Sequence, residues 1–473
     1  MIGIVVSRAD HASTHIGEQL LDLRAWDEQE DETRPDAEGG GTYYRLDGAE
    51  LREFDELHIY MDDPVPAFSA PASIDLVVFV SRHSGNTGPL LTAHFTGNFG
   101  PAEFGGETGR FARAAPGAQW AIVRAFDRYA PDGYGVGIEC THHGPTAVSA
   151  PSMFAEVGSD EKQWRDPAAA RAVANAVLSL LQDDADEWDR KRRIVGFGGG
   201  HYAPRFERIL RETDWAIGHI GADWALEAMA SAAAPDETTE GDGSDQSASD
   251  RREVIERAFE ASGADRAVVE GDRPALERTI ADLGYDVVSE TWLRAVGDRP
   301  LSIVERVESE LSSVEAGLRF GSIRVDDPSG TTDGAELEYV ALPAALLEEA
   351  CGIDGEAAYE AVEANTVAFE TEEGATKPVG RAAIVEKTSE RSPYDAIVDA
   401  LAAILREKYD EVTRRDGRVI ATAVGFDPEL AVDLGVPEGP VFGTLAAGEP
   451  VEIDGRRIDP ADVRSERRVE FEY

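Results

Sequence analysis

The segment at residues 139–145 places a carboxylate, a thiol and two imidazoles within five residues, Glu139-Cys140-Thr141-His142-His143, directly before Gly144-Pro145. Histidine is the usual acid or base at neutral pH and the commonest metal ligand. Neighbouring side chains of an extended chain point to opposite sides, so both imidazoles reach one site only if the chain turns here. The segment indicates acid–base or metal-assisted chemistry, with a surface strand end as the alternative.

The remaining histidines strengthen this interpretation, because all nine lie before residue 220. His83 lies in Ser-Arg-His-Ser-Gly, and His94 lies in Leu-Thr-Ala-His-Phe-Thr-Gly-Asn. A single histidine is more often structural, whereas several at the ends of apolar runs indicate a shared site. No Gly-x-Ser-x-Gly motif is present, which disfavours an α/β-hydrolase serine triad.

A glycine run, Gly198, Gly199 and Gly200, precedes His201 and a helix-like segment that starts at Pro204. Glycines let a ligand approach the backbone closely, and a helix N-terminus favours an anion. The spacing fits neither a P-loop nor a dinucleotide fingerprint, so a tight turn is the alternative. The basic run 190–193 is a candidate phosphate contact, with a solvated face paired to local carboxylates as its alternative.

Short apolar, β-branched runs at 2–6, 75–80, 134–140, 193–197 and 214–220 predict strands, and each ends in a polar cluster. Residues 167–181 predict a helix with Asp166 as its cap. This alternation predicts an α/β fold with a mixed, mostly parallel sheet and flanking helices. Ligands bind at the carboxyl ends of strands in such sheets, which is where the clusters fall.

The composition describes the solvent more than the substrate. The chain has 473 residues with 45 Lys+Arg against 92 Asp+Glu, a net charge of −47, and only five of the cations are lysines. We expect a protein of molar internal salt, where the Debye length is about 3 Å and self-repulsion is screened. Net charge therefore does not exclude a nucleic-acid substrate. With two cysteines, no secretory signal and no membrane-length apolar run, we expect a cytoplasmic protein.

Changes in sequence texture suggest the domain organisation. Residues 27–41 and 234–252 are expected to be acidic surface insertions, the second a disordered loop, and 325–334 a linker. We expect one domain at 1–324 and a smaller α+β domain at 335–473 that contains no histidine.

Seven segments resemble the archaeal-type D-aminoacyl-tRNA deacylases, in that family's order and over about residues 1–318: SRADHAS, FVSRHSG, LTAHFTGN, ECTHHGP, FAEVGS, GGGHYAP and GHI. The chain looks like a halophilic version with a C-terminal extension. The resemblance implies hydrolysis of the ester between a D-amino acid and tRNA, a zinc requirement of one or two ions, and a fold like peptidyl-tRNA hydrolase and nucleoside phosphorylases. It implies no stable protein partner and no membrane, and we expect a monomer. Residues 435–463 resemble a segment of ribonuclease Z, without its metal-binding histidines.

On this resemblance we assign expected roles. Glu139, His142, His143 and His201 are the metal candidates, and His83 and His94 are the acid–base candidates. Substrate binding is expected from Gly198, Gly199, Gly200, His219, Arg192 and Arg193. Two alternatives stay open: a non-catalytic tRNA- or nucleotide-binding protein with 335–473 as its binding module, and another hydrolase or phosphorylase on the same fold.

Overall fold

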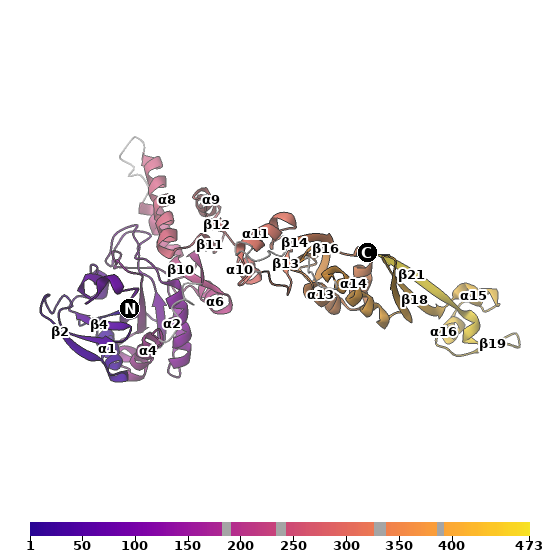
Figure 1. Cartoon of the computed structure of the whole chain (residues 1–473), viewed down its shortest axis with the longest axis horizontal. Coiled ribbons are helices and arrows are strands. Elements are labelled where there is room, and N and C mark those ends of the chain that lie inside the picture. The colour runs from indigo at the N-terminus through magenta and orange to yellow at the C-terminus, as the bar shows by residue number, and fades with distance from the viewer. Residues whose placement is uncertain (182–190, 233–242, 326–336, 386–391) are drawn as a thin grey trace. The chain divides into compact units, whose positions relative to one another are not determined.

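The computed structural model describes residues 1–181, 191–232, 243–325, 337–385 and 392–473. The chain forms two compact units, Met1–Gly297 and Asp298–Tyr473 (Figure 1). The sequence places a boundary near residue 325, whereas helix α11 (Leu301–Glu310) and strand β13 (Arg319–Phe320) belong to the second unit, where β13 pairs with β15 (Ala368–Glu372). The linker 325–334 lies almost entirely outside the described residues.

The first unit is built on a mixed eight-stranded sheet in the order β2-β3-β4-β1-β5-β8-β6-β7. Its central strands β4, β1, β5 and β8 are parallel, β6 runs antiparallel to β8, and β7 is parallel to β6. The strands are β1 Ile2–Ser7, β2 Asp27–Asp31, β3 Gly41–Leu46, β4 Ala49–Phe54, β5 Leu76–Arg82, β6 Leu90–His94, β7 Gly135–Ile138 and β8 Ser152–Gly158. The predicted fold class is confirmed.

The two faces of this sheet are covered differently. Helices α1 (His11–Leu23), α2 (Pro116–Tyr129) and α4 (Pro167–Ser179) pack together on one face, where Gly17 lets α1 approach Val6 closely. The opposite side chains, such as Val5 and Phe79, pack under the short helical turns between β4 and β5. This alternation follows from the two-residue period of a strand. Asp166 caps α4, as predicted.

The five predicted apolar runs divide between two sheets. The first three become β1, β5 and β7 of the main sheet, and the last two become β9 and β10 of a second sheet. Its order is β10-β9-β11-β12, and all its strands are parallel. Its elements are β9 Arg192–Phe197, α6 Pro204–Glu212, β10 Trp215–Gly221, α7 Asp223–Ala232, α8 Gly243–Ser262, β11 Arg266–Val269, α9 Pro274–Asp282, β12 Asp286–Val287 and α10 Glu290–Val296.

Two expected insertions differ in the structure. Residues 27–41 include β2, which pairs with β3 as the edge hairpin of the main sheet. Exposed acidic residues on an edge strand discourage pairing with another chain, which accounts for their composition. The expected disordered loop 234–252 lies outside the described residues up to 242, and from Gly243 onward the chain is helix α8.

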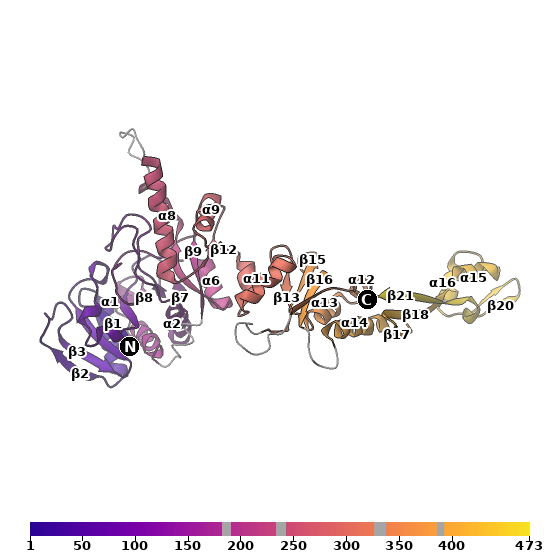
Figure 2. The ribbon, with the colours of Figure 1, turned by 45° about the horizontal axis from the view of Figure 1, so that its top comes forward.

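The second unit is α+β, as predicted. It contains the antiparallel sheets β13-β15-β16-β14 and β17-β18-β21 and the hairpin β19-β20. Figure 2 shows β18 and β21 side by side, paired over nine residues. Further elements are β14 Leu337–Ala341, α12 Ala344–Ile353, α13 Gly355–Glu363, β16 Lys377–Val385, α14 Pro393–Ile404, β17 Glu411–Arg415, β18 Arg418–Phe426, α15 Pro428–Asp433, α16 Pro440–Ala446, β19 Val451–Ile453, β20 Arg456–Ile458 and β21 Arg464–Glu472. Among the described residues, no helix has the length and apolar character needed to cross a membrane.

Candidate active site

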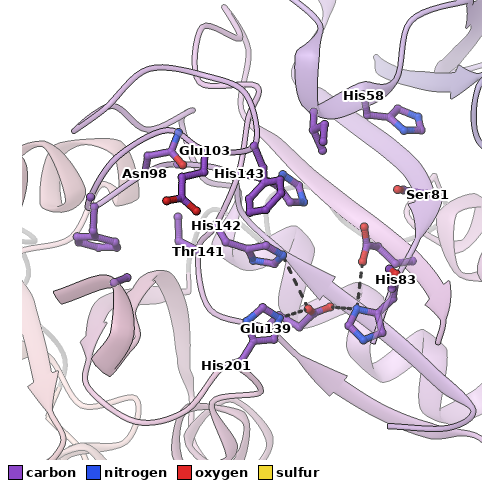
Figure 3. A pocket seen from close by; sticks show the side chains of 18 of the residues that line it. His58, Ser81, His83, Asn98, Glu103, Glu139, Thr141, His142, His143 and His201 are labelled. Atoms are coloured by element: carbon purple, nitrogen blue, oxygen red, sulfur yellow. Dashed lines mark hydrogen bonds and ion pairs between the residues drawn. The ribbon is translucent and has the colours of Figure 1, made fainter. Parts of the chain in front are cut away.

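A cavity of about 690 Å³ opens where the carboxyl ends of strands from both sheets of the first unit meet. The segment after β7 joins the two sheets, because the Cys140 amide donates to the His201 carbonyl at 2.8 Å and the Thr141 amide donates to the Ile220 carbonyl at 2.9 Å. The ionisable and polar side chains of the wall include Asp10, His58, Ser81, Arg82, His83, Glu139, Thr141, His142, His143, Glu156 and His201 (Figure 3).

Glu139 lies at the centre of this group and is fully buried. One carboxylate oxygen, Oε2, lies 2.7 Å from His201 Nε2 and 3.9 Å from His142 Nε2, and Oε1 lies 3.2 Å from His83 Nδ1 (Figure 3). Burial raises the pKa of Glu139, but the hydrogen bonds from His201 and His83 outweigh it and hold the pKa well below its ordinary value. Glu139 is therefore a carboxylate surrounded by imidazoles.

Glu156, on β8, is a second buried carboxylate and was not among the residues expected at the site. Its Oε2 lies 3.7 Å from His83 Nδ1, and its Oε1 lies 3.5 Å from His94 Nε2. Burial raises the pKa of Glu156, and the bonds to His83 and His94 lower it by more. The sequence does contain a signal for Glu156: it is the one carboxylate in the apolar run 152–158, and a buried carboxylate must be paired.

His83 lies between these two carboxylates. Burial alone lowers the pKa of His83, but the hydrogen bonds to Glu139 and Glu156 outweigh this and raise it to about 11. Its other ring nitrogen, Nε2, lies 3.2 Å from the Tyr202 hydroxyl, and the Trp164 indole donates to the His83 carbonyl at 2.9 Å. The side chain is thus a proton carrier held in one orientation on the cavity wall.

Three further imidazoles share one arrangement, in which Nδ1 faces a backbone carbonyl. The distances are 3.2 Å from His94 to Phe95, 2.7 Å from His142 to Cys140, and 2.7 Å from His143 to Gly144. Because a carbonyl only accepts, Nδ1 carries the hydrogen in all three rings. Nε2 of neutral His142 and His143 keeps its lone pair, whereas Nε2 of His94 faces the Glu156 carboxylate. Hydrogen bonds of this kind hold the rings of metal-binding histidines in place.

The adjacent histidines both face the site because the chain turns between them. His143 has a left-handed backbone with φ of 46°, uncommon for a residue other than glycine, and the His142 and His143 rings lie 4.4 Å apart. Burial, followed by the neighbouring imidazoles, lowers the pKa of His142 to about 3 and that of His143 well below its ordinary value. Both are neutral at physiological pH, which is the form that binds metals.

His94 occupies a different place from that expected of a direct acid or base. Its ring stacks on His142 at 4.3 Å and on Phe154 at 5.0 Å, fully buried behind the cavity wall. Burial alone lowers the pKa of His94, but its contact with Glu156 raises it overall. His94 therefore contacts Glu156 and does not line the cavity.

The donor atoms fit a divalent metal. In the described part of the chain, three groups of donors lie within 4.8 Å of one another: His94, His142 and His143; Cys140, His142 and His201; and His83, Glu139 and Glu156. Two ligands of one tetrahedral zinc lie about 3.3 Å apart, a value between the 2.7 Å and 3.9 Å that separate Glu139 Oε2 from His201 and His142. Among the same residues, the buried atoms Glu139 Oε1 and His94 Nε2 contact His83 at 3.2 Å and Glu156 at 3.5 Å without a well-aligned hydrogen bond.

The glycine run shapes the site without lining the cavity. Gly198 and Gly199 have φ of 98° and 81°, and a Cβ at Gly198 would lie 2.5 Å from the Glu270 carbonyl oxygen. Only glycine fits that turn. The run, including Gly200, connects β9 to α6 and holds His201 against Glu139. The glycine run therefore forms a tight turn, the alternative to a ligand-binding loop, and it does not line the cavity.

The structure does not bring Arg192 and Arg193 to the cavity. They begin β9, whereas the cavity lies beyond the other end of that strand. Arg192 donates to the Gly297 carbonyl at 3.1 Å, and Lys191 lies 3.8 Å from Asp214. Arg190 lies outside the described residues. The helical arginines downstream are paired as well: Arg205 and Arg208 with Glu290, and Arg211 with Glu207 and Asp127.

His219 is also behind the wall, where it supports the junction of the two sheets. Its Nε2 lies 2.9 Å from the Ala112 carbonyl and must donate, so Nδ1 accepts from the Thr141 hydroxyl at 3.0 Å. That hydroxyl oxygen accepts in turn from the Ile220 amide. Burial lowers the pKa of His219 from 6.5 to about 4.

This depressed pKa predicts acid sensitivity. Neutral His219 stabilises the fold fully above pH 6.5, and about 3 kcal/mol is lost as the pH falls through the range down to about 4. In His219→Gln the amide retains both hydrogen bonds and does not titrate. Denaturant unfolding at constant molar KCl should therefore show a smaller loss of stability for the variant between pH 6.5 and 4.5. Parallel stability curves for the two proteins would contradict this assignment.

Comparisons with known proteins identify the family of the chain. A crystal structure described as a conserved protein of unknown function, AF0625, superposes with a TM-score of 0.52 at 27% identity, covering 62% of this chain and 96% of that one. The family model for D-aminoacyl-tRNA deacylase matches residues 70–288. A D-aminoacyl-tRNA deacylase from Halorubrum lacusprofundi is 54% identical over 100% of this chain and 96% of its own length. The chain belongs to the D-aminoacyl-tRNA deacylase family.

Other relatives show that the second unit is shared. The D-aminoacyl-tRNA deacylase of Haloarcula marismortui is 49% identical over 99% of both chains. That of Methanosphaerula palustris is 32% identical over 98% of this chain and 96% of its own length. The second unit is therefore not confined to relatives from halophilic archaea. The high identity to relatives from halophilic archaea supports the halophilic origin that the scarcity of lysine predicts.

Proposed function

We propose that this chain hydrolyses the ester that joins a D-amino acid to the 3′-terminal ribose of tRNA, releasing free tRNA and the D-amino acid. The observation that carries the proposal is His83, held between two buried carboxylates on the wall of a cavity that also presents His142 and His201. The relatives, which are named D-aminoacyl-tRNA deacylases, support the same reaction.

The groups present match the steps of ester hydrolysis. A water oxygen attacks the carbonyl carbon, the bond from that carbon to the ribose oxygen breaks, and a proton reaches the departing ribose oxygen. In our proposal Glu139 takes the proton of the attacking water, and His83 supplies a proton to the ribose oxygen. His94 is a positioning residue that acts through Glu156.

We further propose that zinc, as one or two ions, is held by donors from Glu139, His142, His143 and His201. Each of these residues offers a donor atom next to the cavity, and the Nδ1 contacts of His142 and His143 leave Nε2 available. Bound zinc would lower the pKa of a water and polarise the ester carbonyl. His142 contributes to two of the donor groups, so its loss should affect any ion bound here.

Metal removal tests this assignment. Protein stripped with a chelator in molar KCl should contain no zinc by mass spectrometry, should melt at a lower temperature, and should lose deacylation at least about 100-fold. Added Zn²⁺ should restore one or two ions per chain together with activity. His142→Ala should bind less zinc than the parent protein, whereas His11→Ala, which replaces an exposed histidine, should bind the same amount. Full activity in protein shown to be metal-free would exclude the zinc proposal.

Product analysis tests the reaction against its alternatives. D-tyrosyl-tRNA labelled in the amino acid is incubated with the protein, with and without inorganic phosphate. A deacylase gives free D-tyrosine and intact tRNA at the same rate in both cases. A binding protein gives no turnover, and a phosphorylase-like enzyme requires phosphate.

A further inference from the structure

Large apolar side chains that are more than a third exposed are few in the described part of the chain, and those that are aromatic gather at the cavity. They are Tyr60, Phe104 and Trp224, which are 54%, 61% and 49% exposed. Phe104 and Trp224 line the cavity, and Tyr60 follows Ile59, another lining residue. Aromatic surface left in water at the edge of a site marks a place where a ligand binds.

The backbone around these rings is held firmly. The Phe104 carbonyl accepts from the Gly144 amide at 3.1 Å, next to the two histidines. The Asn98 side-chain amide donates to the Gly105 carbonyl at 3.0 Å. Gly105 has φ of 81°, and a Cβ there would lie 1.7 Å from the Ile59 carbonyl oxygen and 3.3 Å from the Tyr60 ring. The backbone that follows Phe104 thus packs against the segment that carries Tyr60.

The same loop also reaches the helix that carries Trp224. A Cβ at Gly100 would lie 2.8 Å from the Ala228 side chain, so the loop packs directly on α7. Trp224 is the second residue of that helix, and Ala225 and Ala228 line the cavity beside it. The loop that carries Phe104 therefore packs both on the segment of Tyr60 and on the helix of Trp224.

We propose that Phe104 and Trp224, with Tyr60 beside them, stack on the unpaired nucleobases at the 3′ end of the tRNA. This inference rests on the proposed function. When the ester carbonyl lies at Glu139 and His83, the terminal ribose and its base are joined to it by a few bonds and must lie at the cavity entrance. Single-stranded RNA is recognised by stacking of its bases on aromatic side chains.

The salt of the working environment favours this kind of contact. Phosphate contacts weaken steeply as salt rises, because the gain from counterion release falls. Near the site the helical arginines Arg205, Arg208 and Arg211 are already paired with carboxylates. Stacking on an aromatic ring depends little on salt, and it works for every base because each base has a π-face. It thus supplies affinity that persists in molar salt.

Binding of a short RNA that carries no amino acid tests the proposal without any chemistry. The probe is a fluorescein-labelled heptaribonucleotide that ends in CCA, titrated in 2 M KCl, against the same oligomer with its last three bases removed but its sugars and phosphates intact. Phe104→Ala and Trp224→Ala should each weaken binding by about 5-fold to 150-fold. Phe104→Tyr should restore it. Val287→Ala replaces an exposed apolar residue of β12, outside the cavity lining, and should bind like the parent protein.

The outcomes separate this inference from the proposed function. Weak binding of the abasic oligomer by the parent protein, together with the losses above, supports stacking. Equal binding of both oligomers, or unchanged binding by both alanine variants, overturns it even when D-tyrosyl-tRNA is hydrolysed normally. A parent protein that binds the oligomer through its bases but hydrolyses no D-aminoacyl-tRNA overturns the proposed function and leaves stacking in place. Thermal melting of each variant confirms that it is folded.

Discussion

Glu139→Gln should reduce kcat/KM for D-tyrosyl-tRNA by about 1000-fold, the largest loss from any single side chain in the cavity. The buried carboxylate contacts His201, His142 and His83 at once. The amide keeps the shape but carries no charge, so it neither holds His83 as a cation nor accepts a proton from water. Single-turnover deacylation with excess enzyme measures this step directly.

The control for Glu139 is a carboxylate from the loop that carries Phe104. The Glu107 side chain is exposed, and its ion pair with Arg110, at 3.9 Å, is long and open to solvent. Glu107→Gln should therefore keep the parent rate. Since a glutamine side chain has nearly the same volume as a glutamate, Glu139→Gln should keep the parent fold, as judged by its circular dichroism in molar KCl. If Glu139→Gln kept more than a tenth of the parent rate, Glu139 would not be the centre of the chemistry.

Glu156→Gln should reduce kcat by about 100-fold and narrow the pH range of activity. Two carboxylates together raise the pKa of His83 to about 11, so removing one lowers it. The protonated form is then lost at a lower pH, and the alkaline limb of the pH–rate profile should move toward neutral pH in the variant. Rates corrected for spontaneous ester hydrolysis give both quantities. An unchanged alkaline limb with a lower rate would mean that Glu156 only maintains the packing around His94.

The strands and the cluster of histidines could be predicted because their signals are local. Apolar runs ending in polar residues identify β1 and β5, and the Asp166–Pro167 pair identifies the start of α4. From the shared carboxyl ends of parallel strands, the sequence predicts His83, Glu139 and His201 together. The two histidines do lie within hydrogen-bonding distance of the Glu139 carboxylate, although β7, which precedes Glu139, runs opposite to β5.

The remaining features depend on contacts between distant segments. Glu156 lies in the middle of an apolar strand, and only the pairing of β8 with β5 and β6 shows that it faces His83 and His94. Arg192 and Arg193 are close in sequence to the glycine run but lie at the far end of the same strand. His219 resembles the other strand-end histidines in sequence, yet the Thr141 and Ala112 contacts give it a structural place.

The central claim is that this cavity hydrolyses D-aminoacyl esters of tRNA, and chirality tests it most directly. Rejection of the L form must come from differential stabilisation of the transition state, because the two substrates differ only in the arrangement about one carbon. The measurement is the single-turnover rate for D-tyrosyl-tRNA and L-tyrosyl-tRNA in molar KCl, with Glu139→Gln in parallel. We predict rapid release from the D ester, release from the L ester at the uncatalysed rate, and release from the D ester about 1000-fold more slowly by the variant. Equal rates for both esters, or no turnover of the D ester by the zinc-loaded protein, would contradict the claim.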